Sequence, residues 1–119
     1  MSKLIWEHSS PHSEIGSTGH LCLVDVYETK IRIGYGADAI FTFAMSVMCE
    51  TDTVTGERLV LADYSPQGEY GDLFLPLDDE NTEYVSVDAA KAACENKATE
   101  IIKHLYKELE ILIDRLSCD

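Results

Sequence analysis

The sequence predicts an α+β fold, in which an antiparallel sheet of four to five strands is packed by one long C-terminal helix. Two observations lead to this class. Residues 21–64 hold runs of β-branched and aromatic residues separated by turn-forming residues, which is typical of strands. Residues 87–116 contain neither glycine nor proline and repeat apolar residues at helical spacing. We therefore expect a single acidic domain of 119 residues, with the sheet over about residues 3–77 and the helix over about residues 87–116.

The first twenty residues predict one strand and one loop. Residues 3–7 (KLIWE) favour a short strand, and the Ser, His, Pro and Gly residues of 9–19 favour a loop. Imidazole and carboxylate groups are suitable zinc ligands, and they recur here as His8, His12, Glu14 and His20. Their spacing fixes no common geometry, so exposed loop histidines are favoured over a zinc site.

Two further strands are predicted next, over residues 21–27 (LCLVDVY) and 31–35 (IRIGY). The break at residues 28–30 is short enough for a hairpin. Glycine weakens a strand interior, so Gly34 and Gly36 predict a bulge or bend at the end of the second strand.

Residues 39–49 form the longest strand candidate. One face would carry Phe41, Phe43, Met45, Val47 and Cys49, and the other Ile40, Thr42, Ala44, Ser46 and Met48. Neither face is charged, which predicts a central strand that is at least partly covered on both sides. Residues 51–56 supply turn chemistry and residues 57–64 return as the partner of a hairpin. Residues 65–80 predict a loop with an edge strand at 73–75, because Pro66 and Pro76 exclude a central strand.

The C-terminal helix is predicted to begin at Ser86 as N-cap, with Asp88 facing the positive end of the helix dipole. A 30-residue helix is about 45 Å long, whereas a compact domain of this size is about 35 Å across. The helix must overhang the sheet or break, and Asn96 is the expected break. Two interpretations stay open: a helix that lies on its own sheet with a frayed end, and a helix that mates with its own copy. The heptad-spaced residues of the second interpretation are Ile102, Leu105, Leu109, Leu112 and Leu116.

Charge is distributed unevenly along the chain. Residues 50–88 hold eleven acidic residues and one basic residue, Arg58, so this segment carries 1 − 11 = −10 of the formal net charge of −13. Such charge repels nucleic acid and anionic membranes and attracts basic protein surfaces. No basic face can be drawn, so direct binding of nucleic acid or membrane is not expected.

Three interpretations of this acidic segment are open. It is a solvated surface that maintains solubility, or a surface complementary to a basic partner protein, or a divalent cation site at Asp78, Asp79, Glu80 and Glu83. The second interpretation takes its sharpest form as nucleic-acid mimicry, because side chains at i and i+2 of a strand, such as Glu50 and Asp52, lie about 6.7 Å apart on one face, close to the spacing of phosphates along a strand. Aromatic residues would add affinity. The expected partner-binding residues are Glu50, Asp52, Glu57, Asp63, Tyr64, Glu69, Tyr70, Asp72, Phe74, Asp78, Asp79, Glu80 and Glu83.

The sequence supports no catalytic assignment. The four cysteines, Cys22, Cys49, Cys94 and Cys118, form no CxxC pair, and neither a nucleophile elbow nor a glycine-rich phosphate loop is present. We expect no enzyme activity, no cofactor and no metal. Isolated thiols in a chain without a secretion leader or an apolar span predict a reduced, cytoplasmic protein.

The expected function is therefore that of a small acidic binding protein or inhibitor. It would occupy a basic, nucleic-acid-handling surface of a partner protein. In charge and size the chain is similar to phage anti-defence proteins, toxin immunity proteins and secretion chaperones; this is a likeness of composition and covers no aligned motif. Two alternatives are carried: a homodimeric chaperone-like or structural module that mates through the C-terminal helix, and a small metal- or ligand-binding domain.

Overall fold

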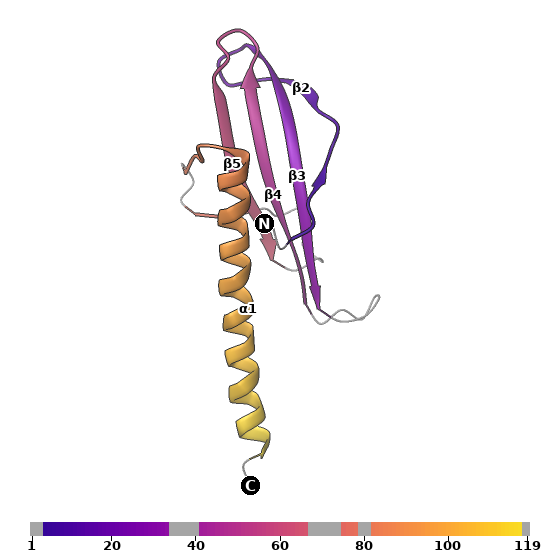
Figure 1. Cartoon of the computed structure of the whole chain (residues 1–119), viewed down its shortest axis with the longest axis vertical. Coiled ribbons are helices and arrows are strands. Elements are labelled where there is room, and N and C mark those ends of the chain that lie inside the picture. Colours follow the sequence, from indigo (N-terminus) through magenta and orange to yellow (C-terminus); the bar gives the residue numbers. More distant parts are fainter. Residues whose placement is uncertain (1–3, 34–40, 67–74, 79–81, 118–119) are drawn as a thin grey trace.

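The computed structural model of the chain describes residues 4–33, 41–66, 75–78 and 82–117. These residues form one antiparallel sheet and one long helix that lies along the sheet (Figure 1). The α+β class and the single long C-terminal helix that the sequence predicts are confirmed. The elements in chain order are β1 (Glu7–His8), β2 (His12–Ile15), β3 (Leu21–Ile33), β4 (Phe41–Asp52), β5 (Arg58–Pro66), β6 (Leu75–Pro76) and α1 (Val87–Ser117).

The sheet is a meander, in which strands that follow one another along the chain lie side by side. Its order is β1–β3–β4–β5–β6, and each neighbouring pair is antiparallel. β2 also pairs antiparallel with β3. Because β4 occupies the opposite edge of β3, β1 and β2 share one position and the sheet is five strands wide. β4 lies in the middle, as predicted from its uncharged faces.

The predicted break at residues 28–30 is wrong, because β3 runs through it as one strand of 13 residues. Its register with β4 is continuous from the pair Cys22–Asp52 to the pair Ile33–Phe41. Alternation explains the continuity: Thr29 is buried and donates a hydrogen bond to the Ile5 carbonyl at 2.6 Å, whereas its two charged neighbours are exposed. Polar residues are therefore compatible with the strand, because Glu28 and Lys30 face solvent and the buried Thr29 hydroxyl has a hydrogen-bond partner.

The N-terminal predictions are corrected in two places. The strand expected at residues 3–7 is reduced to Glu7–His8, and the loop expected at residues 9–19 contains the strand β2. Both short strands hydrogen-bond along the free edge of β3. Backbone pairing on a long edge needs no apolar sequence pattern, which is why exposed His, Ser and Glu residues form strands here. The bend predicted at Gly34 and Gly36 lies outside the described residues.

The predicted β4–β5 hairpin is confirmed. Nine consecutive residue pairs join the two strands, from Thr51–Arg58 to Phe43–Pro66. Gly56 takes a positive φ of 76° in the connecting turn, a conformation that glycine adopts without a Cβ penalty. The expected edge strand is present as β6 on the outer side of β5. It begins at Leu75, so the start of the predicted 73–75 segment lies outside the described residues.

The core lies between the helix and one face of the sheet, which we call the covered face. Alternate residues of β4 point into it, and Phe43, Met45, Val47 and Cys49 are each at most 2% exposed. The helix meets them with three buried small residues, Ala90, Cys94 and Ala98. Small side chains let the helix backbone approach the sheet closely, so the larger strand side chains fill the space between the two layers.

The helix begins as predicted and then extends past the sheet. The Ser86 hydroxyl accepts a hydrogen bond from the Ala89 amide at 3.0 Å, which is N-cap geometry. The break expected at Asn96 does not occur, because the helix is continuous over 31 residues. It therefore overhangs: the described chain measures 68 × 27 × 26 Å, and the C-terminal half of α1 has no strand beside it in Figure 1. The radius of gyration is 17.5 Å, against about 13–14 Å for a compact domain of this length.

Candidate functional site

The face of the sheet that points away from the helix is strongly acidic. We call it the open face; it holds the residues that alternate with those of the core. Directly paired residues of an antiparallel sheet point to the same side, so the register assigns each charged side chain to a face. Among the described strand residues, the open face carries six acidic side chains, Glu7, Glu14, Glu28, Glu50, Asp52 and Asp63, and two basic side chains, Lys30 and Arg32.

Four acids of the sequence-predicted set converge on a hollow at the end of the sheet that the helix does not reach. The hollow has a volume of about 230 Å³, and its lining includes Glu50, Asp52, Glu57 and Glu83. Glu83 arrives there because the segment before the helix runs beside β5, where the Tyr84 amide donates to the Val60 carbonyl at 3.0 Å. Residues more than 30 positions apart in the sequence thus form one acidic surface.

One basic residue, Arg58, also lines this hollow. Its guanidinium donates a hydrogen bond to Cys49 Sγ at 3.3 Å, and Cys49 belongs to the core. Arg58 is directly paired with Thr51 on the covered side of the sheet. The guanidinium is therefore directed toward the Cys49 sulfur in the core. Because four acidic residues and one basic residue line the hollow, the formal charge of its lining is negative.

Gly16 allows the loop after β2 to close over this hollow. A Cβ atom at Gly16 would lie 2.7 Å from Cys22 Sγ and 3.0 Å from Glu50 Oε1, so no side chain fits there. Burial and the neighbouring Glu50 carboxylate raise the pKa of the Cys22 thiol. A thiol with a raised pKa stays protonated near neutral pH and is a poor nucleophile.

Asp52 has a structural role within the hollow. One of its carboxylate oxygens accepts hydrogen bonds from the Val54 and Thr55 amides at 2.8 and 3.1 Å. The other contacts His20 Nδ1 at 2.9 Å and the Thr18 hydroxyl at 3.3 Å. These contacts, the one from His20 above all, lower the pKa of Asp52 to about 2. Asp52 is 8% exposed, and both of its oxygens are engaged, so Glu50, Glu57 and Glu83 are the carboxylates that a partner can reach.

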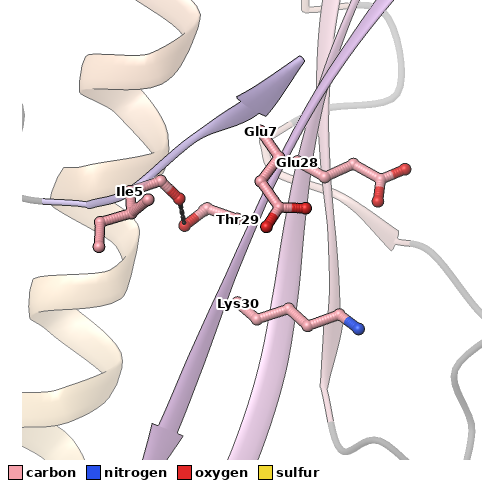
Figure 2. A pocket seen from close by; sticks show the side chains of 5 residues that line it. All are labelled: Ile5, Glu7, Glu28, Thr29 and Lys30. Atoms are coloured by element: carbon pink, nitrogen blue, oxygen red, sulfur yellow. Dashed lines mark hydrogen bonds between the residues drawn. The ribbon is translucent and has the colours of Figure 1, made fainter. Parts of the chain in front are cut away.

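A second hollow lies near the first strand, between the N-terminal segment and β3 (Figure 2). It has a volume of about 280 Å³. Figure 2 shows Glu7, Glu28 and Lys30 extending to one side of β3, while Ile5 and Thr29 lie on the side of the helix. Glu7 and Glu28 are directly opposite each other in the register. Like charges in that relation destabilise a sheet, so a cationic group placed between them would relieve the repulsion.

Four of the six open-face acids form no ion pair in the part of the chain that is described. No ion pair is formed there by Glu7, Glu28, Glu50 or Asp63, since the pairs present are His8–Asp25, His12–Glu14, His20–Asp52 and Lys97–Glu100. Partial burial raises the pKa of Asp63. A carboxylate that is partly buried without a cation gains more from an incoming lysine or arginine than a fully solvated one does.

The other predicted partner-binding residues are distributed more widely. Tyr64 lies on the covered face, where Lys97 Nζ is 5.9 Å from its ring, so it does not accompany the open-face acids. Asp78 is exposed and accepts a hydrogen bond from the Tyr84 hydroxyl; burial and this contact raise the pKa of Tyr84. The predicted residues that lie outside the described part of the chain are Glu69, Tyr70, Asp72, Phe74, Asp79 and Glu80.

The histidines do not assemble into a common site. His8 contacts Asp25 at 3.0 Å, His12 contacts Glu14 at 2.9 Å and His20 contacts Asp52, so each imidazole has its own carboxylate. His8 and His12 lie in strands, not in the expected loop. In the described ranges, no group of three or more His, Cys, Asp or Glu residues is arranged to hold a metal ion. Of the predicted cation site, Asp79 and Glu80 lie outside those ranges.

Sequence reasoning missed three open-face acids, Glu7, Glu14 and Glu28. They precede the acidic segment 50–88 and are far apart in the sequence, so counting charge along the chain does not reveal them. Strand alternation together with correct pairing would have found them, since each lies at a position that faces away from the core.

The C-terminal half of the helix forms a second exposed surface. The predicted helix residues Ile102, Leu109, Leu112 and Leu116 are 41–77% exposed, and Leu105 is half-buried. None of the helical residues that the structure describes makes a segment long and apolar enough to cross a membrane.

Comparisons with protein-family models, curated protein sequences and solved structures found no match to this chain.

Proposed function

We propose that this protein binds a basic surface of a partner protein through the open face of its sheet, and that this partner surface is one that handles nucleic acid. The observation that supports the proposal is a set of described carboxylates that form no ion pair: Glu50, Glu57 and Glu83 around one hollow, and Glu7 and Glu28 at the other. A surface of one sign attracts the opposite sign over a long range and repels nucleic acid itself.

The arrangement fits mimicry of a phosphate backbone in a form that differs from the sequence prediction. The predicted pair Glu50 and Asp52 does share the open face, but Asp52 is engaged by the hairpin turn. The carboxylates available to a partner are therefore distributed across strands and around the hollow. Arginine and lysine side chains of a nucleic-acid-binding groove would enter the hollow and contact its carboxylates in the way that they contact phosphate groups.

The test uses a purified heterodimer of core histones as the basic, DNA-binding probe. We expect the protein to bind this histone dimer and to displace duplex DNA from it, with an affinity that falls at least tenfold between 50 and 300 mM salt. The triple variant Glu50→Gln, Glu57→Gln, Glu83→Gln should lose at least tenfold in affinity.

A matched control removes the same charge from the first half of the helix, as Asp88→Asn, Glu95→Gln, Glu100→Gln. This control should lose less than threefold. Equal losses in the two triple variants would mean that net charge alone drives binding, and binding without displacement of DNA would contradict a nucleic-acid-handling target. Either result overturns the proposal.

A second candidate function is a homodimeric, chaperone-like or structural interaction module. The observation that favours it is the exposed apolar stripe on the overhanging part of α1. The two functions are compatible, because they use opposite ends of the molecule.

A further inference from the structure

The overhang, residues 102–117, continues the apolar stripe by which the helix packs on its own sheet. Ala98 is buried against the covered face, and Leu105 and Leu112 follow it at intervals of seven residues. Seven residues nearly complete two turns of an α-helix, so the three side chains point in the same direction. The stripe is thus covered by the sheet in the first half of α1 and has no strand beside it in the second half (Figure 1).

The overhang has no strand against which to pack its apolar residues. Its 16 residues extend about 24 Å at 1.5 Å per residue. Most helices in proteins gain their stability by packing an apolar face. Ile102, Leu109 and Leu116 are 41%, 56% and 77% exposed. Their spacing of seven residues is that of a coiled-coil seam.

We propose that the overhang binds the overhang of a second copy of this chain, and that the two helices run antiparallel. This inference rests on the second candidate function and adds its contact segment and orientation. The sheet occupies the space in front of the stripe up to Ala98, so a parallel partner would place the first half of its own helix inside that sheet. In an antiparallel pair, the partner's overhang lies against the overhang of the first chain and ends just short of the first chain's sheet. The partner's sheet then lies past the C-terminal end of the first chain's helix.

The charges along the overhang agree with an antiparallel pair. The charged side chains that flank the heptad-spaced apolar residues are Glu108 and Arg115, which directly precede Leu109 and Leu116. An antiparallel pair sets Glu108 of each helix beside Arg115 of the other, whereas a parallel pair does not bring these two side chains together. The overhang as a whole has three basic residues and three acidic residues. It is charge-balanced, unlike the sheet, and does not repel its copy.

The proposed dimer is a rod with one acidic sheet at each end. Two chains of 68 Å that share an overlap of about 24 Å span about 110 Å. The open faces lie far from the helical junction and stay accessible in both copies. A bivalent arrangement would raise the apparent affinity for a target that repeats its basic surface.

The test measures the mass of the full chain in solution by sedimentation equilibrium between 1 and 100 µM. We expect a dimer that the single changes Leu109→Glu and Leu112→Glu each convert to a monomer. Val85→Glu is the matched control, because Val85 is 96% exposed outside the overhang; this variant should remain dimeric. The overhang does not contribute to the core, so circular dichroism should show that each monomeric variant keeps its sheet and unfolds at a temperature that no longer depends on protein concentration.

Orientation is tested by placing a photo-crosslinking residue at Ser117 in a mixture of isotopically labelled and unlabelled chains. Antiparallel packing joins residue 117 to the first turn of the partner's overhang, near residues 101–103. A crosslink to the end of the partner's helix would overturn the antiparallel arrangement. A chain that stays monomeric at 100 µM would overturn the dimer itself, and it would leave the proposed binding by the open face intact.

Discussion

His20 donates a hydrogen bond through Nδ1 to the carboxylate of Asp52 at 2.9 Å, and this contact ties the loop after β2 to the turn between β4 and β5. The same carboxylate holds the Val54 and Thr55 amides of the turn. The helix does not reach this end of the sheet, so polar contacts around one acid take the place of core packing there. They also shape the hollow that we propose as the binding surface.

Acid should loosen this end of the molecule first. The pKa of Asp52 is about 2 in the folded chain against an ordinary value of 3.8, so the folded state favours the ionised form. The stabilisation is complete above the unfolded value and is lost as the pH falls from about 4 to about 2. Urea unfolding of the protein and of Asp52→Asn should therefore differ most above pH 4 and converge near pH 2. Glu57→Gln, a change at an exposed residue, should not reproduce that pattern, and a constant difference across this pH range would contradict the assignment.

Truncation of Phe43 should destabilise the whole fold. Its side chain is 1% exposed on β4, within the core beneath the helix. Phe→Ala substitutions in such positions cost about 3–5 kcal/mol through lost burial and a residual cavity. Chemical denaturation should show this loss for Phe43→Ala, whereas Val54→Ala, at a residue 69% exposed in the turn, should stay within about 0.5 kcal/mol of the wild type. A similar loss in both variants would mean that the core does not lie where the structure places it.

Removal of the helix cap should weaken the start of α1. The Ser86 hydroxyl accepts from the Ala89 amide, which otherwise has no partner within the first turn. Ser86→Ala is expected to cost about 1 kcal/mol, measured by thermal or urea unfolding. Ser86→Asp keeps the acceptor and should restore most of the loss. If Asp fails to restore it, the hydroxyl acts through some contact other than the cap.

Cys94 should resist alkylation in the folded protein. It is fully buried between helix and sheet, and burial, followed by nearby acids, raises the pKa of its thiol to about 12. At pH 8 this lowers the thiolate fraction about a thousandfold relative to an ordinary cysteine. Mass spectrometry after iodoacetamide treatment should find Cys94 unmodified until urea is added. A cysteine introduced at the exposed residue Val85 supplies the control and should react at once; fast labelling of both would contradict the packing of α1.

Part of the fold can be predicted from local pattern. The central position of β4, the β4–β5 hairpin, the cap at Ser86 and the bounds of α1 each depend on residues close together in the sequence, and each is confirmed. The errors concern pairing between segments. The local pattern splits β3 at Glu28 and favours a loop over β2, because exposed polar residues carry little local strand signal and gain their conformation from the neighbouring strand.

Composition and periodicity are sufficient to specify an acidic α+β domain with a helix longer than a compact domain of its size, since both can be read without knowing any contact. The location of the charge depends on the folded chain. Strand register places Glu7 and Glu28 opposite each other, the path of the chain before α1 brings Glu83 to the hollow that Glu50 lines, and the hairpin turn engages Asp52. Folding also determines that α1 continues past Asn96 and overhangs. Strand pairing determines how far the sheet extends beside the helix, and therefore where the overhang begins. No local sequence pattern specifies that pairing.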